Sequence, residues 1–210
     1  MQSIYFVDSN FTYESSKKSI LSIRYATDGF SFCVHDETEK LVVFVHEPYA
    51  ADSREAVVAK LKNYVVNDTI LNLRFKKVYI MPCFKEKLLV PGAFFDKANI
   101  ATLYTVNQEV SPDDTILYHH IEGIEAYLVE TVISSFHDFV REHFPVVQIV
   151  NGAYPFILGA MSKALRDTEQ IFLDIQDNYF DLLFIRDSGI QLFNTFSYKA
   201  MTDIVYFLLN

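Results

Sequence analysis

The chain has 210 residues, of which half are hydrophobic, and its 19 Phe and 13 Tyr provide material for one large domain or two small lobes with real cores. This apolar content argues against long disordered stretches. The 18 Lys and Arg against 27 Asp and Glu give a net charge of -9 without a basic stripe, which disfavours a nucleic-acid partner.

Neither a secretory signal nor a membrane span is predicted. The first 16 residues lack a basic region followed by an apolar core, and the longest apolar candidate, Ile204–Leu209, falls far short of the roughly 18 residues a span needs. Cys33 lies inside a strand pattern and Cys83 at a strand end, so we expect buried free thiols rather than a disulfide or a nucleophile. These features indicate a reducing, cytoplasmic compartment.

The N-terminal third is predicted to be a surface arm followed by a three-stranded meander and a helix. Residues up to about Lys18 are polar and aperiodic, which suggests the arm. Alternating apolar residues predict strands over 19–25 and 30–35, joined by an Asp28-Gly29 turn. Residues 41–45 are apolar on both faces, so we expect a covering layer over this third strand. The helix would begin at Asp52 or Ser53 and carry apolar residues at helical spacing to Val65.

The middle of the chain alternates between predicted strands and helices. Expected strands cover 77–81, 116–120, 124–129 and 146–150, and expected helices cover 131–143 and 155–165. The Pro91-Gly92 pair marks a turn into a short helical piece.

The most informative feature is an internal duplication. Residues 171–197 repeat the plan of residues 20–47: strand, polar turn, strand, polar turn, strand, then a helix. The final helix, 199–209, is hydrophobic all round and must be covered. We expect a missing C-terminal segment, self-association or a protein partner to cover it.

A duplicated meander with crossover helices predicts an α/β fold of the duplicated ribonuclease H-like or actin-like ATPase type. The first lobe is predicted over residues 1–165. The second, over 166–210, would hold only three strands and one helix and so be incomplete.

Three segments resemble a group of bacterial proteins of unknown function with a ribonuclease H-like, actin-like ATPase fold. They are LLVPGAFFD, LSIRYATDGFSFCVHD and the stretch from IFLDI to DIVYFLL, which contains LFNTF. More distantly, the order of elements is similar to the actin-like proteins of type IV pilus assembly and of secretion-system scaffolds.

The resemblance implies two phosphate-binding hairpins, each with an Asp on the strand and a glycine close behind it. Here Arg24 stands in the position of the acid, Ala26 in that of the glycine and Ser31 in that of a phosphate-binding Lys or Gln. In the second copy Asp174 remains, but Gln176 replaces the glycine.

Two further carboxylates, Asp177 and Asp181, would repel a triphosphate unless a metal intervenes. Asp174, Asp177 and Asp181 are therefore the candidate remnant of a nucleotide or metal site, although surface acids and turn formers explain them more simply. No Gly-Gly turn for adenosine follows before Asn210. We expect no cofactor and no catalytic residue.

Other chemistries find less support in the residues. A nuclease would need three or four carboxylates around a metal pair, the first of them in the first strand, where Arg24 stands. His119, His120 and Glu122 could suggest zinc, but adjacent strand residues face opposite sides. His137 and His143 are six apart on a helix and are predicted to be solvated.

The favoured hypothesis is a non-catalytic interaction or scaffold protein. The alternative is an ATP- or divalent-metal-binding enzyme of the same superfamily that uses the second hairpin.

Overall fold

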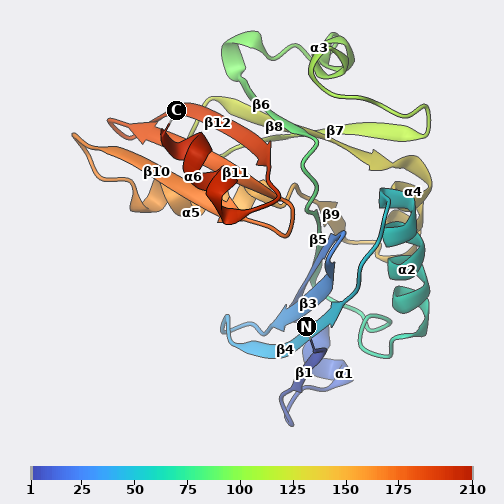
Figure 1. Cartoon of the computed structure of the whole chain (residues 1–210). Helices are drawn as coiled ribbons and strands as arrows, with labels where there is room; N and C mark the ends of the chain where they lie inside the picture. The colour runs from blue at the N-terminus through green and yellow to red at the C-terminus, as the bar shows by residue number, and fades with distance from the viewer. Residues whose placement is uncertain (1, 210) are drawn as a thin grey trace. The chain divides into compact units, whose positions relative to one another are not determined.

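The computed structural model describes residues 2–209 and contains helices and strands in alternation (Figure 1). The strands are β1 (Ile4–Val7), β2 (Ile20–Ala26), β3 (Gly29–His35), β4 (Leu41–Pro48), β5 (Lys77–Pro82), β6 (Lys87–Pro91), β7 (Asp114–His120), β8 (Ala126–Ile133), β9 (Val147–Ile149), β10 (Glu169–Ile175), β11 (Tyr179–Arg186) and β12 (Gly189–Ser197). The helices are α1 (Tyr13–Ser16), α2 (Arg54–Asn67), the 3-10 helix η1 (Gly92–Phe94), α3 (Ile100–Asn107), α4 (Ser134–His143), α5 (Ala153–Lys163) and α6 (Met201–Leu209). The predicted α/β class is confirmed.

The chain divides into two compact units, each built from separate segments. Unit 1 comprises residues up to Phe84, Ser111–Thr115 and Val132–Val150. Unit 2 comprises Lys85–Val110, Ile116–Thr131 and the residues from Asn151 on. The division into lobes at residue 165 stays a prediction.

Unit 1 contains a six-stranded sheet in the order β1-β4-β3-β2-β5-β9. The strands β2, β3 and β4 form the predicted antiparallel meander, and β5 and β9 extend it in parallel. Leu21, Ile23 and Tyr25 on β2 are buried, whereas Ser22 and Arg24 are only partly so, as period-two alternation requires.

Two helices contribute to the core of unit 1. Ser53 caps α2 by accepting a hydrogen bond from the Ala56 N–H at 3.2 Å, and α2 buries Val57, Val58, Leu61 and Val65. The α4 residue Phe136 lies against Tyr25 of β2, with ring centroids 5.1 Å apart. Both helices thus bury apolar side chains in the core of unit 1.

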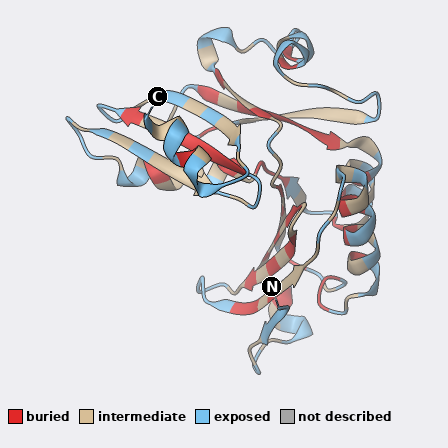
Figure 2. Ribbon diagram, in the orientation of Figure 1, coloured by how far each residue is buried: buried red, intermediate tan, exposed pale blue. Residues whose placement is uncertain are grey.

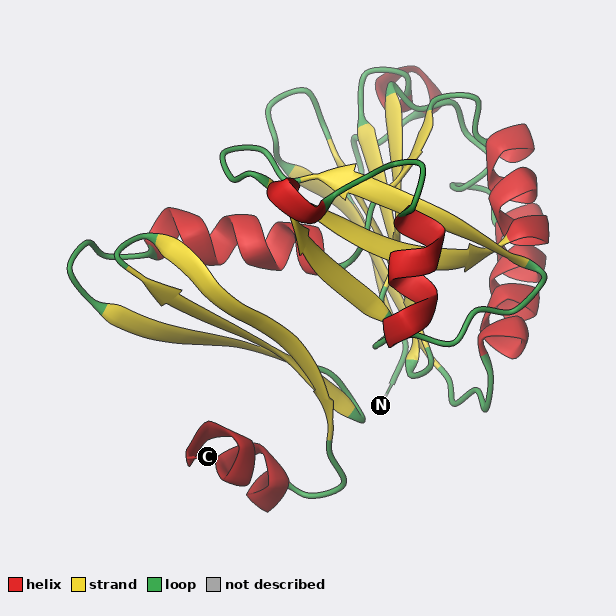
Figure 3. Ribbon diagram, turned by 90° about the horizontal axis from the view of Figure 1, so that it is seen from above, coloured by secondary structure: helices red, strands yellow, loops and turns green. Residues whose placement is uncertain are grey.

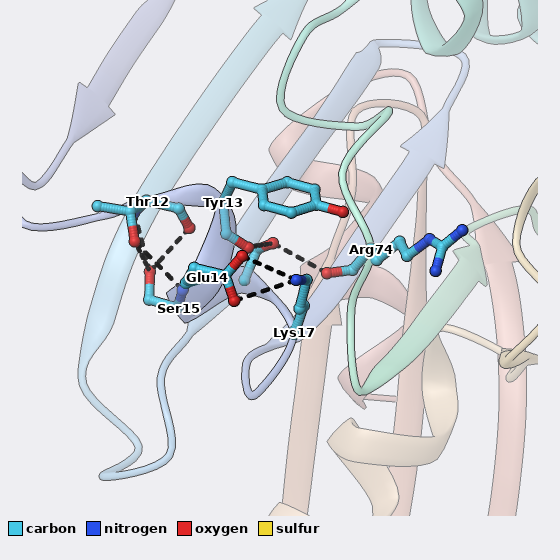
Figure 4. A network of polar contacts seen from close by, with 7 residues as sticks. Thr12, Tyr13, Glu14, Ser15, Lys17 and Arg74 are labelled. Carbon is cyan, nitrogen blue, oxygen red and sulfur yellow. Dashed lines mark hydrogen bonds and ion pairs between the residues drawn. The ribbon is translucent and has the colours of Figure 1, made fainter.

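The prediction of an N-terminal surface arm was wrong. β1 pairs antiparallel with β4, and Thr12 and Ser15 form a capping box at the start of α1. The buried Ser16 hydroxyl donates to the carbonyl oxygen of Arg74 at 2.9 Å. Figure 4 shows Thr12 and Ser15 of the capping box with the neighbouring Lys17 and Arg74. β4 and Arg74 lie far along the chain from the residues they contact, so local periodicity does not predict these contacts.

Unit 2 contains two three-stranded sheets, β6-β8-β7 and β10-β11-β12. The second is the predicted second meander, with β11 in the middle (Figure 3). Its Leu183 and Ile185 pack in a core with Ile157 of α5 and Leu128 of β8. Its opposite face, through Phe180 and Leu182, packs against Ile204 of α6.

Two segments in the middle of the chain differ from prediction. Thr131–Ile133 belong to β8 rather than to the following helix, because these β-branched residues continue the buried strand before Ser134 begins α4. Residues 87–91 form the strand β6 before the predicted turn, and η1 follows it.

Candidate functional site

A buried cluster of charged and polar side chains lies in unit 2 where its strands and the start of α5 converge. At its centre, Lys87 of β6 and Asp181 of β11 form an ion pair with 2.8 Å between Nζ and Oδ1. The two side chains are only 2% and 3% exposed. A charge in such a place needs a partner, because an unpaired buried ion is very costly.

Protein groups surround the Asp181 carboxylate, which is almost completely buried. Thr195 of β12 donates its hydroxyl to Oδ1 of Asp181 at 2.6 Å, and the Lys87 ammonium lies 4.7 Å from the ring centroid of Tyr179. Burial raises the pKa of Asp181; Lys87 and Thr195 oppose this rise, and the neighbouring Asp174 adds to it. The expectation that Asp181 is a surface acid was therefore wrong, since its cation comes from a strand far upstream.

A second carboxylate, Glu130 of β8, lies opposite Lys87 in the β6–β8 register. Asn151 donates its side-chain N–H to Oε2 of Glu130 at 2.7 Å, and its carbonyl oxygen accepts the N–H of Ala153 at the start of α5. Lys87, Glu130 and Asn151 are each at least 95% buried. This arrangement fixes α5 to the β6-β8-β7 sheet.

The two adjacent histidines lie in different environments, as strand alternation predicts. His119 is partly buried, with its Nε2 3.9 Å from Oε1 of Glu130, and burial lowers the pKa of His119. His120 is exposed, as is Glu122. Among residues 2–209, no three His, Cys, Asp or Glu side chains are grouped so that they could hold a metal ion.

The helix α4 carries the other histidine pair. The ring of His143 stacks on Phe139 and contacts Phe144 edge-on, and burial lowers its pKa. The prediction of a solvated His143 was wrong. His137 lies beside Asp138 with 3.2 Å between Nδ1 and Oδ1.

The structure brings together only two of the three predicted aspartates. Asp174 is directly opposite Asp181 in the β10–β11 register, whereas Asp177 is exposed in the turn. The Gln176 N–H donates to the Tyr179 carbonyl at 2.9 Å, and the Gln176 carbonyl accepts the Tyr198 hydroxyl at 2.6 Å. The second hairpin turn is thus bound to its own strands.

The first hairpin turn is also engaged by nearby groups of unit 1. The N–H groups of Tyr49 and Ala51 donate to the carbonyls of Asp28 and Thr27. Nη1 of Arg24 lies 3.5 Å from Oδ1 of Asp28. Burial, and then the Asp28 charge, raise the pKa of Tyr49 to about 12. The Asp28 carboxylate lies in this turn. A phosphate site would instead need backbone N–H groups that a phosphate can approach.

Two clefts occur beside these elements of unit 2. One, of about 570 Å³, has walls that include Asn178 of the second turn, Tyr198, Lys199 and Phe207. The other, of about 280 Å³, is lined in part by Lys85, Lys87, Gln108 and Thr195. Because Asp181 neutralises Lys87, the buried cluster presents neither a free base nor a free cation to the second cleft.

The strand order and the duplicated meanders define an actin-like ATPase fold. A Bacteroides thetaiotaomicron protein of unknown function with this fold is similar over 95% of this chain and 77% of its own, with 23% identity and a TM-score of 0.86. The chain belongs to the family described as "Protein of unknown function (DUF3822)", whose model matches residues 8–210.

Other solved structures are less similar to this chain. The PilM-PilN type IV pilus biogenesis complex is 11% identical, with 85% of this chain and 61% of that chain covered and a TM-score of 0.45. An exopolyphosphatase from Cytophaga hutchinsonii is 11% identical, with 90% and 53% covered and a TM-score of 0.40. No curated protein matches the sequence. No helix in the described part of the chain is long and apolar enough to cross a membrane.

Proposed function

We propose that this protein is a non-catalytic interaction or scaffold module that keeps an actin-like fold and binds no nucleotide. The observation that supports this most directly is the buried Lys87–Asp181 pair. It ties one of the three candidate aspartates into the structure of unit 2. Because Lys87 and Asp181 neutralise each other, the pair holds β6 against β11 and does not serve to bind a ligand.

The turns support the same proposal. Phosphates are held by backbone amides that a glycine leaves approachable, but the second turn carries Gln176 and the exposed carboxylate of Asp177. The first turn carries Asp28 in contact with Arg24. An added anion would meet a carboxylate at each turn.

Thermal unfolding of the 210-residue chain with Mg-ATP, Mg-ADP or Mn²⁺ tests the proposal. We expect no change in Tm at millimolar nucleotide. A ligand at 100 times its Kd would add about 2.7 kcal/mol of stability, which such a measurement readily detects. A clear rise in Tm with Mg-ATP would overturn the proposal.

The alternative is an ATP- or metal-binding enzyme that uses the second hairpin. It is favoured by the direct cross-strand pairing of Asp174 with Asp181 and by the cleft beside Asn178. In that case Asp174→Ala would remove a nucleotide-dependent rise in Tm, while Asp52→Ala, at an exposed position before α2, would serve as the comparison.

We further propose that the protein works in a reducing, cytoplasmic compartment and meets its partner through α6. Cys33 and Cys83 carry thiols and are not joined in a disulfide. On α6, Met201, Val205 and Leu209 are more than half exposed, which is unusual for apolar side chains on one short helix. A protein partner or a second copy would cover them.

A further inference from the structure

The second meander brings two carboxylates together on one face of its sheet. Asp174 and Asp181 are directly opposite each other on β10 and β11, and Thr195 is opposite Asp181 on β12. Residues opposite each other in a ladder point to the same side of the sheet. Figure 2 shows β11 as a largely buried strand between its two neighbours. Burial raises the pKa of Asp181 and the Asp174 charge adds to this rise, so a nearby cation is needed to keep Asp181 ionised.

The cation comes from another sheet of unit 2. Lys87 begins β6, and its ammonium lies 2.8 Å from Oδ1 of Asp181, with only 2% of the Lys87 side chain exposed. Glu130 of β8 is opposite Lys87 in the ladder and points to the same side. Lys87 is thus the cation in a cluster that contains carboxylates from three strands, β8, β10 and β11.

The same cluster does not fit the divalent metal that this fold implies. An ATPase holds the triphosphate through Mg²⁺, which takes oxygen ligands in a near-octahedral arrangement. Here Oδ1 of Asp181 is already engaged by the Lys87 ammonium and the Thr195 hydroxyl. Within residues 2–209, no three His, Cys, Asp or Glu side chains are grouped so that they could hold an ion. A divalent ion placed beside Asp181 would also be repelled by the charge of Lys87.

The second cleft of unit 2 leads to Lys87 but not to Asp181. Its volume is about 280 Å³, and both Lys87 and Thr195 line it, whereas Asp181 is absent from its walls. Because the Lys87 ammonium contacts Asp181, the Lys87 side chain lies between the cleft and the carboxylate. A shorter side chain at position 87 would therefore open the carboxylate to the cleft.

We propose that the Lys87 ammonium is the resident cation of Asp174 and Asp181, and that it takes the place of the divalent metal expected in an ATPase of this fold. The chain itself supplies the charge, so the two aspartates need no ion from solution. A fixed ammonium also rejects competing cations by repulsion. The inference rests on the proposed function and gives it a cause, because a hairpin that cannot take up a metal cannot hold a metal-nucleotide complex through it.

A first test uses the wild-type 210-residue chain and Mn²⁺, a paramagnetic ion that broadens the NMR signals of nearby nuclei. We expect millimolar Mn²⁺ to broaden the amide signals of Asp174 and Asp181 no more than that of Asp52, an exposed surface acid. Selective broadening at Asp174 and Asp181 would overturn the proposal, because a metal would then bind with Lys87 in place. This measurement needs no substitution, so it keeps its force even where a variant fails to fold.

A second test removes the ammonium with Lys87→Ala. We expect this variant to be less stable than the wild type, and its Tm to rise by about 2–4 °C in millimolar Mn²⁺, whereas the Tm of the wild type stays unchanged. Selective broadening at Asp174 and Asp181 should accompany the rise. NaCl at the same ionic strength controls for screening, and it should give no comparable rise.

Two variants provide the controls. Lys85→Ala removes an ammonium that borders the same cleft but is 56% exposed, and it should gain no Mn²⁺ binding. Lys87→Met/Asp181→Leu removes both charges of the pair and should gain none either. A folded Lys87→Ala chain that takes up Mn²⁺ no better than Lys85→Ala would overturn the proposal.

Failure of the proposed function would be recognised separately. A rise in the Tm of the wild-type chain with Mg-ATP would reject the proposed function. Mn²⁺ binding gained only by Lys87→Ala would still assign the cation of this cluster to Lys87, because that comparison contains no nucleotide.

Discussion

At the level of single residues, the Lys87–Asp181 pair links β6 to β11 inside unit 2. Its two charges are almost completely removed from water, and Thr195 provides a further hydrogen bond. Removal of one partner from a buried pair leaves the other charge unpaired, whereas replacement of both by apolar residues is often neutral.

We therefore predict that Asp181→Asn lowers the free energy of unfolding by about 3–5 kcal/mol. The double variant Lys87→Met/Asp181→Leu should recover most of this loss. Urea denaturation provides the measurement, with Asp177→Asn in the exposed turn as a control that should change stability by no more than about 0.5 kcal/mol. A loss of similar size in the control would contradict the role given to the pair.

His119 predicts a pH dependence of stability. Burial lowers its pKa from the ordinary 6.5, so between the lowered value and 6.5 the unfolded chain binds more protons than the folded chain. Stability then rises with pH in this interval and is lost as pH falls below 6.5. His119→Gln should reduce the loss of unfolding free energy between pH 7.5 and 5.5, whereas His120→Gln, at an exposed site, should not. Equal slopes for the two variants would exclude this origin.

At the level of elements, both meanders follow from apolar runs of strand length separated by polar turns, and β11 buries both of its faces. The N-terminal β1 could not be predicted, since its four residues depend on pairing with β4. The burial of Asp181 could not be predicted either, because no local pattern indicates that Lys87 would meet it. Conversely, the exposed Asp177 and the pairing of Asp174 with the second strand follow from the turn itself.

The hairpin between β2 and β3 requires glycine at position 29. Gly29 has φ +146°, and a Cβ added there would lie 2.5 Å from the Glu47 carbonyl oxygen. We predict that Gly29→Ala destabilises the chain by about 1–3 kcal/mol. Gly159→Ala in α5 is the matched control, because it has open space and should stabilise by about 0.5–1 kcal/mol. Chemical denaturation of both variants would show whether their effects have opposite signs.

The helix α6 has one face in the core and one in solvent. Ile204 is 3% exposed and packs on Phe180 and Leu182, so Ile204→Ala should cost about 2–5 kcal/mol. Val205→Lys, on the exposed face, should change stability by about 0.5 kcal/mol or less. Thermal or urea unfolding of the two variants provides the measurement. A large loss in Val205→Lys would show that this face is already covered.

At the level of the whole molecule, charge sets the expected partners. With a net charge of -9 and no basic stripe, the chain offers little to neutralise phosphates. We predict no binding to duplex DNA or single-stranded RNA at 0.15 M salt in a fluorescence anisotropy titration. Binding that weakens steeply with added salt would contradict this prediction.

The interleaving of segments in unit 1 has a consequence for biosynthesis. Its sheet draws β5 from residues 77–82 and β9 from residues 147–149, with segments of unit 2 between them in the chain. During translation the first meander and α2 therefore emerge before the strand that closes the sheet edge. Until β9 is made, β5 is itself an unpaired edge strand, the kind of surface that chaperones protect from aggregation.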